Sequence, residues 1–372
     1  MPKKKKKKTT SFYKKFITVI SVTTVLLLWL TAGSAHINPE KFRFFSVFGL
    51  AFPILLACTG ALFLVCLLTA WKRAWIPLVG IAACSLSIRS YFPINFPSPA
   101  PKDSYKFMTY NAMGFASFKK GANSEECKNL LNYVVDSDPD FFCFQEGMPN
   151  PASFLHDGLF QKLGKSMPYH DYQIIDANIL GCCSKFPIVK KELLCKSLMN
   201  GVAVFHVKLN EKDTLRIINC HLQSMGLTVD ERVRYHDIVK HPKNNGQNME
   251  DHSRLLISKI SKASVIRAAQ ADTVATYIEK NKGKNIILCG DFNDTPISYT
   301  YQRIYNSGLS DAYRDTGNGM GRSFNRDGII VRIDHLFYSK HWKPFSCHVD
   351  KSITESDHYP LVCYFQRIKS KE

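Results

Sequence analysis

The first 92 residues alternate charged clusters with three long apolar runs. Residues 16–35 and residues 44–71 contain no charged side chain. About 20 helical residues cross the roughly 30 Å hydrocarbon core of a bilayer, so both runs are predicted to be transmembrane helices. Residues 74–92 form a third run, which contains Arg89. This run spans the membrane only if the Arg89 side chain reaches the far interface.

The basic residues around these runs predict which side of the membrane each end occupies. Lysines fill positions 3–8, and Lys72 and Arg73 separate the second run from the third. Because basic loops remain in the cytoplasm, three spans give an integral, multi-pass protein whose amino terminus is cytoplasmic and whose residues after 95 are extracytoplasmic. The lysine run beside a span is also expected to touch anionic lipid of the bilayer.

Two alternatives to this anchor remain open. With two spans instead of three, the chain after residue 95 would lie in the cytoplasm. A cleaved signal peptide competes with the first span, although the apolar stretch of a signal peptide usually has only about 7–15 residues.

After the anchor, residues 1–95, and a proline-rich linker, residues 96–103, the pattern changes to short strand-like runs. They are rich in β-branched and aromatic residues and are separated by turn residues. The strand candidates are residues 105–110, 140–145, 172–175, 188–194, 202–209, 215–220, 285–289, 329–337 and 361–365. Helical periodicity marks residues 124–136, where Asn123 and Glu126 form a capping box, and roughly residues 251–280. Many strands with few helices predict one α/β domain, residues 104–368, with two packed sheets flanked by helices.

The net charge of +18 is concentrated in the anchor. Residues 1–100 contain 13 lysines and arginines against one acid, a net of +12, which leaves 36 − 30 = +6 for residues 101–372. The total therefore argues less for nucleic acid than its size suggests. Several cysteines lie in apolar strand-like runs, where we expect buried free thiols, and no pair has zinc-site spacing. Unpaired thiols favour a reducing compartment, but we give the topology argument more weight.

Polar side chains recur where the predicted strands begin or end. The segments "KFMTYNAMGF", "FFCFQEG", "RIINCHLQS", "IILCGDFND", "VRIDHLFYS" and "SDHYPL" carry, in turn, Asn111, Glu146, His221, Asp291 with Asn293, Asp334, and Asp357 with His358. A polar turn explains any one of them, but not acids, amides and imidazoles in all six segments. Oxygen ligands at a sheet edge suit a hard divalent cation such as Mg²⁺. Histidines beside the cation can bind phosphate oxygens or move protons, so the set predicts hydrolysis of a phosphoester.

These six segments, in this order, resemble the endonuclease/exonuclease/phosphatase superfamily, which includes deoxyribonuclease I, apurinic endonucleases, inositol polyphosphate 5-phosphatases and neutral sphingomyelinases. The resemblance covers about residues 104–368. It implies a four-layered α/β sandwich with the site at one edge of the two sheets. It also implies a metal-dependent hydrolase that acts on phosphoester bonds, with Mg²⁺ as the cofactor and Mn²⁺ or Ca²⁺ as alternatives.

The resemblance assigns a role to each of these polar residues. Asn111 and Glu146 would hold the metal, Glu146 being the chief ligand, and Asp357 would be a further metal or water contact. Asp291 would orient or deprotonate the attacking water, and Asn293 would contact the phosphate. The remaining assignments concern the imidazoles: His221 would donate to a non-bridging oxygen, and His358, oriented by Asp334, would stabilise the developing charge or transfer a proton.

The substrate class is less well defined by the sequence than the reaction. A nuclease acting on nucleic acid is favoured, because much of the superfamily cuts nucleic acid and the domain is mildly basic. The alternative is a phospholipase C-like or phosphatase activity on a lipid or small phosphoester, since the anchor would hold the site near the bilayer. A non-catalytic membrane scaffold is a remote alternative, because no expected ligand is missing.

Three features depart from a minimal version of this pattern. Residues 225–265 are long and polar, and are predicted to be either a substrate-facing insertion or a mobile excursion. The histidines His236, His241 and His252 in this segment follow no metal spacing and are expected to be solvated. Lys119–Lys120 could meet a nucleic-acid backbone or lie in a solvated loop. Finally, the sequence offers no acid that would orient His221.

Overall fold

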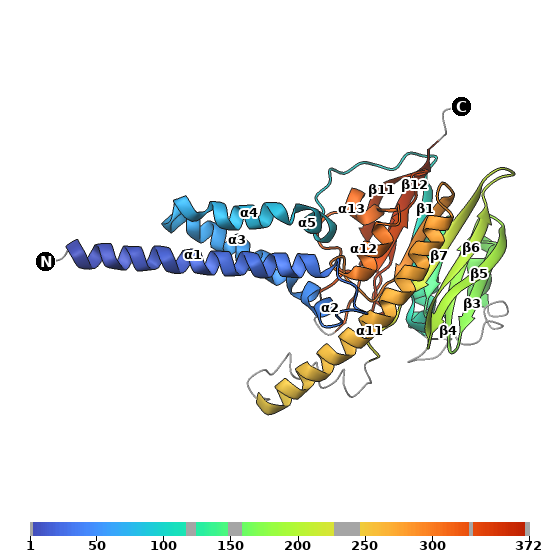
Figure 1. The fold of residues 1–372 in the computed structure, drawn as a ribbon. Helices are drawn as coiled ribbons and strands as arrows, with labels where there is room; N and C mark the ends of the chain where they lie inside the picture. Colours follow the sequence, from blue (N-terminus) through green and yellow to red (C-terminus); the bar gives the residue numbers. More distant parts are fainter. Residues whose placement is uncertain (1–2, 117–123, 148–157, 227–245, 327–329, 369–372) are drawn as a thin grey trace.

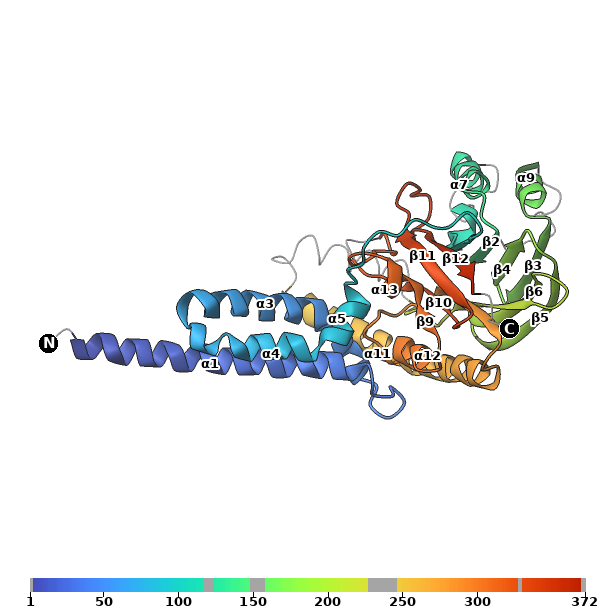
Figure 2. The ribbon, with the colours of Figure 1, turned by 90° about the horizontal axis from the view of Figure 1, so that it is seen from above.

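The computed structural model describes residues 3–116, 124–147, 158–226, 246–326 and 330–368. Its amino-terminal part is a helical bundle built of α1 (Lys3–Ser34), α3 (Phe52–Thr69) and α4 (Trp75–Ala83). Shorter elements complete the bundle, namely α2 (Phe45–Phe48), η1 (Gly49–Ala51), η2 (Trp71–Arg73) and α5 (Ser85–Tyr91). Figures 1 and 2 show α1, α3 and α4 lying side by side, with the β-rich domain at one end of the bundle.

Two helical segments of the bundle are long and apolar enough to cross a membrane. These are Phe12–Ser34, and Phe45–Thr69 with its short helices included. The third segment is bent, because Trp71–Ala83 and Ser85–Tyr91 meet at 60°. The helices at residues 16–35 and 44–71 are therefore present as predicted, whereas residues 74–92 form a broken helix with its bend at Cys84.

The bundle packs directly on the β-rich domain. The backbone oxygen of Ser90, in α5, accepts a hydrogen bond from the buried guanidinium of Arg332. Gly49 lies against the backbone of Ile297, so closely that a Cβ atom there would be 2.1 Å from the Ile297 oxygen. Ile297 also shares an apolar cluster with Phe52 and Tyr91 of the bundle. These contacts hold the anchor against the chain segment that follows β8.

The β-rich domain contains two six-stranded sheets. The first has the order β11-β12-β1-β2-β4-β3 and the second has the order β5-β6-β7-β8-β10-β9. Two pairs of neighbours, β1 with β2 and β7 with β8, are parallel, and the other pairs are antiparallel. The strands of the first sheet are β1 (Tyr105–Asn111), β2 (Phe141–Gln145), β3 (Tyr169–Ile175), β4 (Asn178–Ser184), β11 (Trp342–Val349) and β12 (Leu361–Arg367). Those of the second are β5 (Ile188–Ser197), β6 (Asn200–Lys208), β7 (Thr214–His221), β8 (Asn285–Asp291), β9 (Ser310–Asp311) and β10 (Asp334–Tyr338).

Helices cover the outer faces of the sheets. Figure 2 shows α7 (Glu125–Asp136) and α9 (Gly158–Ser166) on one side, and α11 (Gly246–Lys280) and α12 (Tyr299–Tyr305) on the other. The short elements η3 (Met113–Ala116) and α13 (Ala312–Thr316) complete the domain. Apolar side chains of both sheets pack between them, and each outer face has its own apolar cluster with the helices that cover it. The predicted four-layered α/β sandwich is confirmed.

The differences from the predicted elements have local causes. Strand β4 escapes prediction because it is buried along its whole length and contains Gly181, Cys182 and Cys183 in place of an alternating pattern. Strand β11 contains Pro344, which normally argues against a strand, and it tolerates this residue at the sheet edge beside a bulge. The helix predicted from residue 124 begins at Glu125, and its N-cap is Ser124 rather than Asn123, since the Ser124 hydroxyl accepts from the Cys127 amide.

Two further predictions need correction or completion. The segment predicted as a strand over 329–337 is extended only from Asp334 onward among its described residues. Residues 225–265 are predicted to be a substrate-facing insertion or a mobile excursion, but from Gly246 onward they belong to α11, which starts before the helix predicted over roughly residues 251–280. All twelve cysteines are free thiols, and ten of them are buried, in line with their expected role as small apolar side chains.

Candidate active site

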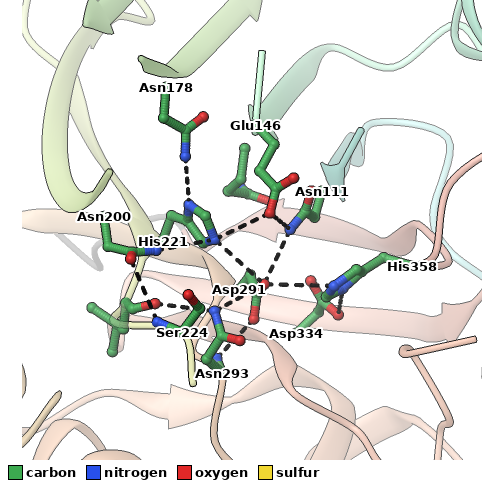
Figure 3. Close-up of polar contacts among 12 residues, drawn as sticks. Asn111, Glu146, Asn178, Asn200, His221, Ser224, Asp291, Asn293, Asp334 and His358 are labelled. Atoms are coloured by element: carbon green, nitrogen blue, oxygen red, sulfur yellow. Dashed lines mark hydrogen bonds and ion pairs between the residues drawn. The ribbon is translucent and has the colours of Figure 1, made fainter. Parts of the chain in front are cut away.

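Strand register brings the polar ends of the strands together at one edge of the two sheets. In the second sheet, His221 at the end of β7 and Asp334 at the start of β10 both pair with Asp291, the last residue of β8. In the first sheet, Asn111 ends β1 opposite Gln145, so that Glu146 follows directly. Figure 3 shows their side chains pointing toward a common centre.

Two of the site residues adopt a left-handed backbone. Glu146 has φ 52° and Asn293 has φ 51°. Residues other than glycine rarely adopt this conformation, which costs of order 1–3 kcal/mol and is concentrated at functional sites. At both positions the chain turns sharply just after a strand, so the polar side chain stays at the sheet edge.

Gly290 allows β7 and β8 to approach closely just before Asp291. Its φ is 124°, and a Cβ atom would lie 2.0 Å from the Cys220 backbone oxygen. We expect Gly290→Ala to lower the free energy of unfolding by about 3 kcal/mol, because both the conformation and the space exclude a side chain. Urea unfolding followed by the fluorescence of Trp342, which is buried between the sheets, measures this change.

Gly164→Ala is the matched control for this substitution. Gly164 lies in α9, a Cβ atom there would have nothing within 4 Å, and alanine favours helices. The control should keep wild-type stability. Equal stability of the two variants would contradict the close approach at Gly290.

The Asn111 amide links the two sheets at the centre of the site. Its Nδ2 donates to Glu146 Oε1 and to Asp291 Oδ2, both at 3.1 Å. The Asn111 Oδ1 accepts from the Met113 amide at 3.3 Å. Two carboxylates therefore converge on one side chain, although Glu146 belongs to the first sheet and Asp291 to the second.

Beside this group lies a buried chain of charges. His358 Nδ1 is 2.8 Å from Asp334 Oδ2, and His358 Nε2 is 3.6 Å from Asp291 Oδ2. Burial alone would lower the pKa of His358, but the carboxylates of Asp334 and Asp291 outweigh it and raise the pKa to about 10. Burial raises the pKa of Asp291 to about 6, against the opposing charge of His358. Burial also disfavours ionised Asp334, but its ion pair with His358 prevails and lowers its pKa.

These shifts imply definite charge states at neutral pH. His358 is an imidazolium and can donate protons, but it cannot act as a base. Asp291 and Asp334 are carboxylates. The site thus has a fixed proton donor beside an acidic group that can accept a proton near neutrality.

Two arrangements of oxygen donors could hold a cation. Asp291, Asp334 and His358 offer ligand atoms within 4.8 Å of one another. In that group, however, the His358–Asp334 contact is an ordinary hydrogen bond that already neutralises the acid. Glu146 and Asp291 fit better, because their oxygens converge on Asn111, whose amide oxygen becomes a third donor if the side chain turns over. The donor set contains no thiolate, which suits Mg²⁺.

The side chain that contacts Nδ1 of His221 is an amide and not an acid. His221 Nδ1 lies 2.9 Å from Asn178 Nδ2, and Nε2 lies 3.3 Å from Asn200 Nδ2. The Nε2 atom also lies 3.5 Å from Glu146 Oε1 and 3.8 Å from Asp291 Oδ2. Sequence reasoning missed both asparagines. Asn178 begins the unpredicted β4, and Asn200 gave no signal beyond its place before a strand.

Asn293 and Asp294 are occupied by structural contacts. The Asn293 amide group donates to the Leu222 backbone oxygen at 3.0 Å and to Asp291 Oδ2 at 3.2 Å, so it holds Asp291 in place. Asp294 accepts from the buried side chain of Arg267, in α11, at 3.0 Å. This ion pair anchors the loop after β8 to the helical layer.

Asp357 lies apart from the converging carboxylates. Its carboxylate is 2.9 Å from Arg326 Nη1, and it lines a hollow of about 390 Å³ that is also lined by Met113 and Glu355. Of the three histidines in the polar segment, His236 and His241 lie outside the described residues, as does Lys119–Lys120, and His252 is on α11.

Comparisons with known proteins bear on the family and the fold of the chain. A family model described as the endonuclease/exonuclease/phosphatase family matches residues 108–358, and a model for a domain of unknown function matches residues 14–91. No curated protein matches the chain by sequence.

Solved structures share the fold at low sequence identity. An endonuclease/exonuclease/phosphatase from Beutenbergia cavernae is 15% identical with a TM-score of 0.50, and the match covers 72% of each chain. The human Nocturnin catalytic domain is 16% identical over 73% of this chain and 97% of its own, with a TM-score of 0.49. A family protein from Bacteroides thetaiotaomicron is 18% identical over 73% and 98%, with a TM-score of 0.48. At such identities the likeness to the Beutenbergia structure supports the fold alone.

Proposed function

Because the chain belongs to the endonuclease/exonuclease/phosphatase family, we propose that it is a membrane-anchored, divalent-metal-dependent phosphodiesterase. The observation that supports this most directly is the meeting of Asn111, Glu146 and Asp291 beside the His358–Asp334 pair. Oxygen donors, a carboxylate base and a fixed cation then lie within one polar centre, a combination that suits phosphodiester hydrolysis.

Glu146, Asn111 and Asp291 would hold the cation, which would polarise a phosphoryl oxygen and neutralise its charge. Mg²⁺ is the proposed metal, with Mn²⁺ and Ca²⁺ as alternatives that accept the same donors. Asp357 keeps only an outer role in this proposal, because its carboxylate is paired with Arg326.

The protein side chains would carry out the proton transfers. Asp291, held by Asn293, would orient the attacking water and accept its proton as the new oxygen–phosphorus bond forms. The bond from phosphorus to the leaving oxygen breaks, and that oxygen leaves with its electron pair and is protonated by solvent. His358, kept cationic by Asp334, stabilises the negative charge that develops on the phosphoryl group.

A nucleic-acid backbone remains the first substrate class, and a lipid phosphodiester is the second. The mild basic excess of residues 101–372, +6, favours nucleic acid. The docking of the bundle on Ile297, six residues after Asp291, favours a substrate at the bilayer surface. Both substrates present the same reacting group, a phosphodiester.

The deciding experiment uses the full chain in detergent micelles, because the bundle supplies the Ser90 oxygen to buried Arg332. Plasmid DNA, RNA, sphingomyelin and inositol phosphates would each be incubated with Mg²⁺ and with excess chelator. Magnesium-dependent cleavage of DNA, RNA or sphingomyelin supports the proposal and identifies the class, whereas cleavage of inositol phosphates alone would indicate a phosphomonoesterase. Cleavage that continues fully in chelator would exclude the proposed metal dependence.

Contacts at both ends of the bundle support three membrane crossings. Arg73, before the bent third segment, donates to Thr18, near the start of the apolar part of α1, Phe12–Ser34. Ser90, at the other end of that segment, contacts the catalytic domain, which also contacts Asn38 just after α1 through Tyr299. If α1 spans the bilayer, residues 73 and 90 therefore lie on opposite sides. Arg89 lies at the domain end, where it donates to Asn95, and so is not at the bilayer centre.

This topology predicts an extracytoplasmic catalytic domain. A reporter fused after residue 103 should be active only outside the cytoplasm, and protease added to intact spheroplasts should release the soluble domain. A reporter active only in the cytoplasm would instead indicate two crossings and would make intracellular nucleic acid the better candidate substrate. A fusion at residue 40, between the first two helices, is the control and should report the outside in either case.

A further inference from the structure

The hydrogen bonds of Asn178 fix the direction of its amide. Its Oδ1 accepts from the Ile179 backbone amide at 2.7 Å, and its Nδ2 donates to the Met199 backbone oxygen at 2.8 Å. Turning the amide over would place oxygen against oxygen and nitrogen against an N–H donor. The NH₂ group of Asn178 therefore stays where it is, with its second hydrogen directed at His221 Nδ1, 2.9 Å away.

This contact determines which nitrogen of His221 carries the proton. Nδ1 must accept, because Asn178 Nδ2 has only hydrogens to offer. A neutral imidazole has one N–H group, so that proton lies on Nε2. Asn200, whose amide is 3.3 Å from Nε2, has only one weak constraint, at 3.5 Å from the Ser224 amide, and it can turn its oxygen toward this N–H.

We propose that Asn178 is a positioning residue that keeps Nδ1 of His221 unprotonated, so that Nε2–H is directed at the phosphate. The consequence for the reaction, which rests on the proposed function, is a division of roles between the two histidines. His221 cannot take a proton from water, because its Nε2 is already protonated and its Nδ1 is occupied by Asn178. It therefore presents its Nε2–H group beside Glu146 and Asp291.

Burial stabilises the hydrogen bonds between His221 and the two asparagines. Asn178, Asn200 and His221 are 7%, 4% and 4% exposed, so water does not compete freely for their hydrogen bonds. If Nδ1 carried a proton, its N–H group would face the NH₂ group of Asn178 and would have no acceptor. A buried donor without an acceptor costs free energy of folding.

Nitrogen NMR tests the proton position directly and without any substrate. The full chain, labelled with ¹⁵N-histidine and held in detergent micelles, gives long-range ¹H–¹⁵N correlations that distinguish Nδ1–H, Nε2–H and imidazolium. The signals lost in His221→Gln identify His221 among the twelve histidines. We expect the Nε2–H pattern at neutral pH. An Nδ1–H or imidazolium pattern would overturn the proposal.

Two variants test the role of Asn178. In Asn178→Asp, which keeps the shape, the carboxylate can accept, so Nδ1 should become protonated. If Nδ1 stays unprotonated there, Asn178 does not set the proton position. In Asn178→Ala, kcat should fall about 10–100-fold, the usual effect of removing a partner that orients a site imidazole.

The exposed Asn210→Asp, in the turn between β6 and β7, is the matched control and should change neither the NMR pattern nor kcat. Unchanged kcat in a folded Asn178→Ala protein would show that Asn178 does not contribute to catalysis through His221. If no phosphodiester is cleaved by the wild type, the proposed function fails, while the NMR result still decides the tautomer.

Discussion

Glu146→Gln should reduce phosphodiester cleavage by more than about 100-fold while the protein remains folded. Glutamine keeps the size of the side chain and can still meet Asn111, but it removes one of the two negative charges that converge there. Loss of an outer partner of a metal ligand costs about 10–100-fold, so loss of a direct ligand should cost more. Activity measured across a range of Mg²⁺ concentrations should show that the variant needs much more metal.

A charge change elsewhere serves as the control for this experiment. Glu211, in the turn between β6 and β7, is 90% exposed in its side chain and pairs only with Lys208 among the described residues. Glu211→Gln should retain wild-type activity and wild-type dependence on Mg²⁺. A Glu146→Gln enzyme with the same dependence on Mg²⁺ as the wild type would show that Glu146 is not a metal ligand.

The parts of the site that the sequence predicted are those fixed by strand register. Asn111, Glu146, His221, Asp291 and Asp334 each lie within one residue of a strand terminus, and parallel or antiparallel pairing brings such termini together. A strand that is recognised in the sequence therefore also places its terminal side chain. The number of strand-like runs predicted the two sheets, and the family resemblance implied the four layers.

The parts that the sequence did not predict depend on contacts between distant segments. Asn178 lies on β4, whose burial on both faces removes the alternating pattern that marks a strand. Arg267 and Arg332 are charged residues that a hydrophobic pattern places outside, yet both are 1–2% exposed because each pairs with an acid, Asp294 and Asp311 respectively. Such pairings appear only when the chain is folded.

The assignment of Asp357 illustrates the limit of carrying roles over by motif. Asp357 and His358 are adjacent in the sequence, but their side chains serve different neighbours. His358 contacts Asp334 and Asp291, whereas Asp357 pairs with Arg326 at the hollow beside the site. A motif that contains both residues therefore does not by itself place both side chains in one centre.

His358→Ala should lower kcat by about 10²–10³-fold, the range for loss of one group that stabilises charge in the transition state. The His358 imidazolium is the cation that balances Asp291 and Asp334, and its removal also leaves two buried carboxylates close together. Asp334→Asn should share much of the loss, because the asparagine no longer holds His358 in its charged form. The two residues act as a unit, so the double variant should be little worse than His358→Ala alone.

Kinetic measurements on the single and double variants separate this unit from a general loss of structure. If the fold-losses in kcat of the two single variants multiply in the double variant, His358 and Asp334 act independently. His348→Ala is the matched control and should keep full activity. His348 is exposed on β11, and among the described residues its side chain hydrogen-bonds only to the Ser346 backbone oxygen. His252→Ala, on α11, should likewise be nearly neutral. If either control lowers kcat more than His358→Ala does, the catalytic centre lies elsewhere. A catalytic His358, buried beside two acids, could not be removed with so small an effect.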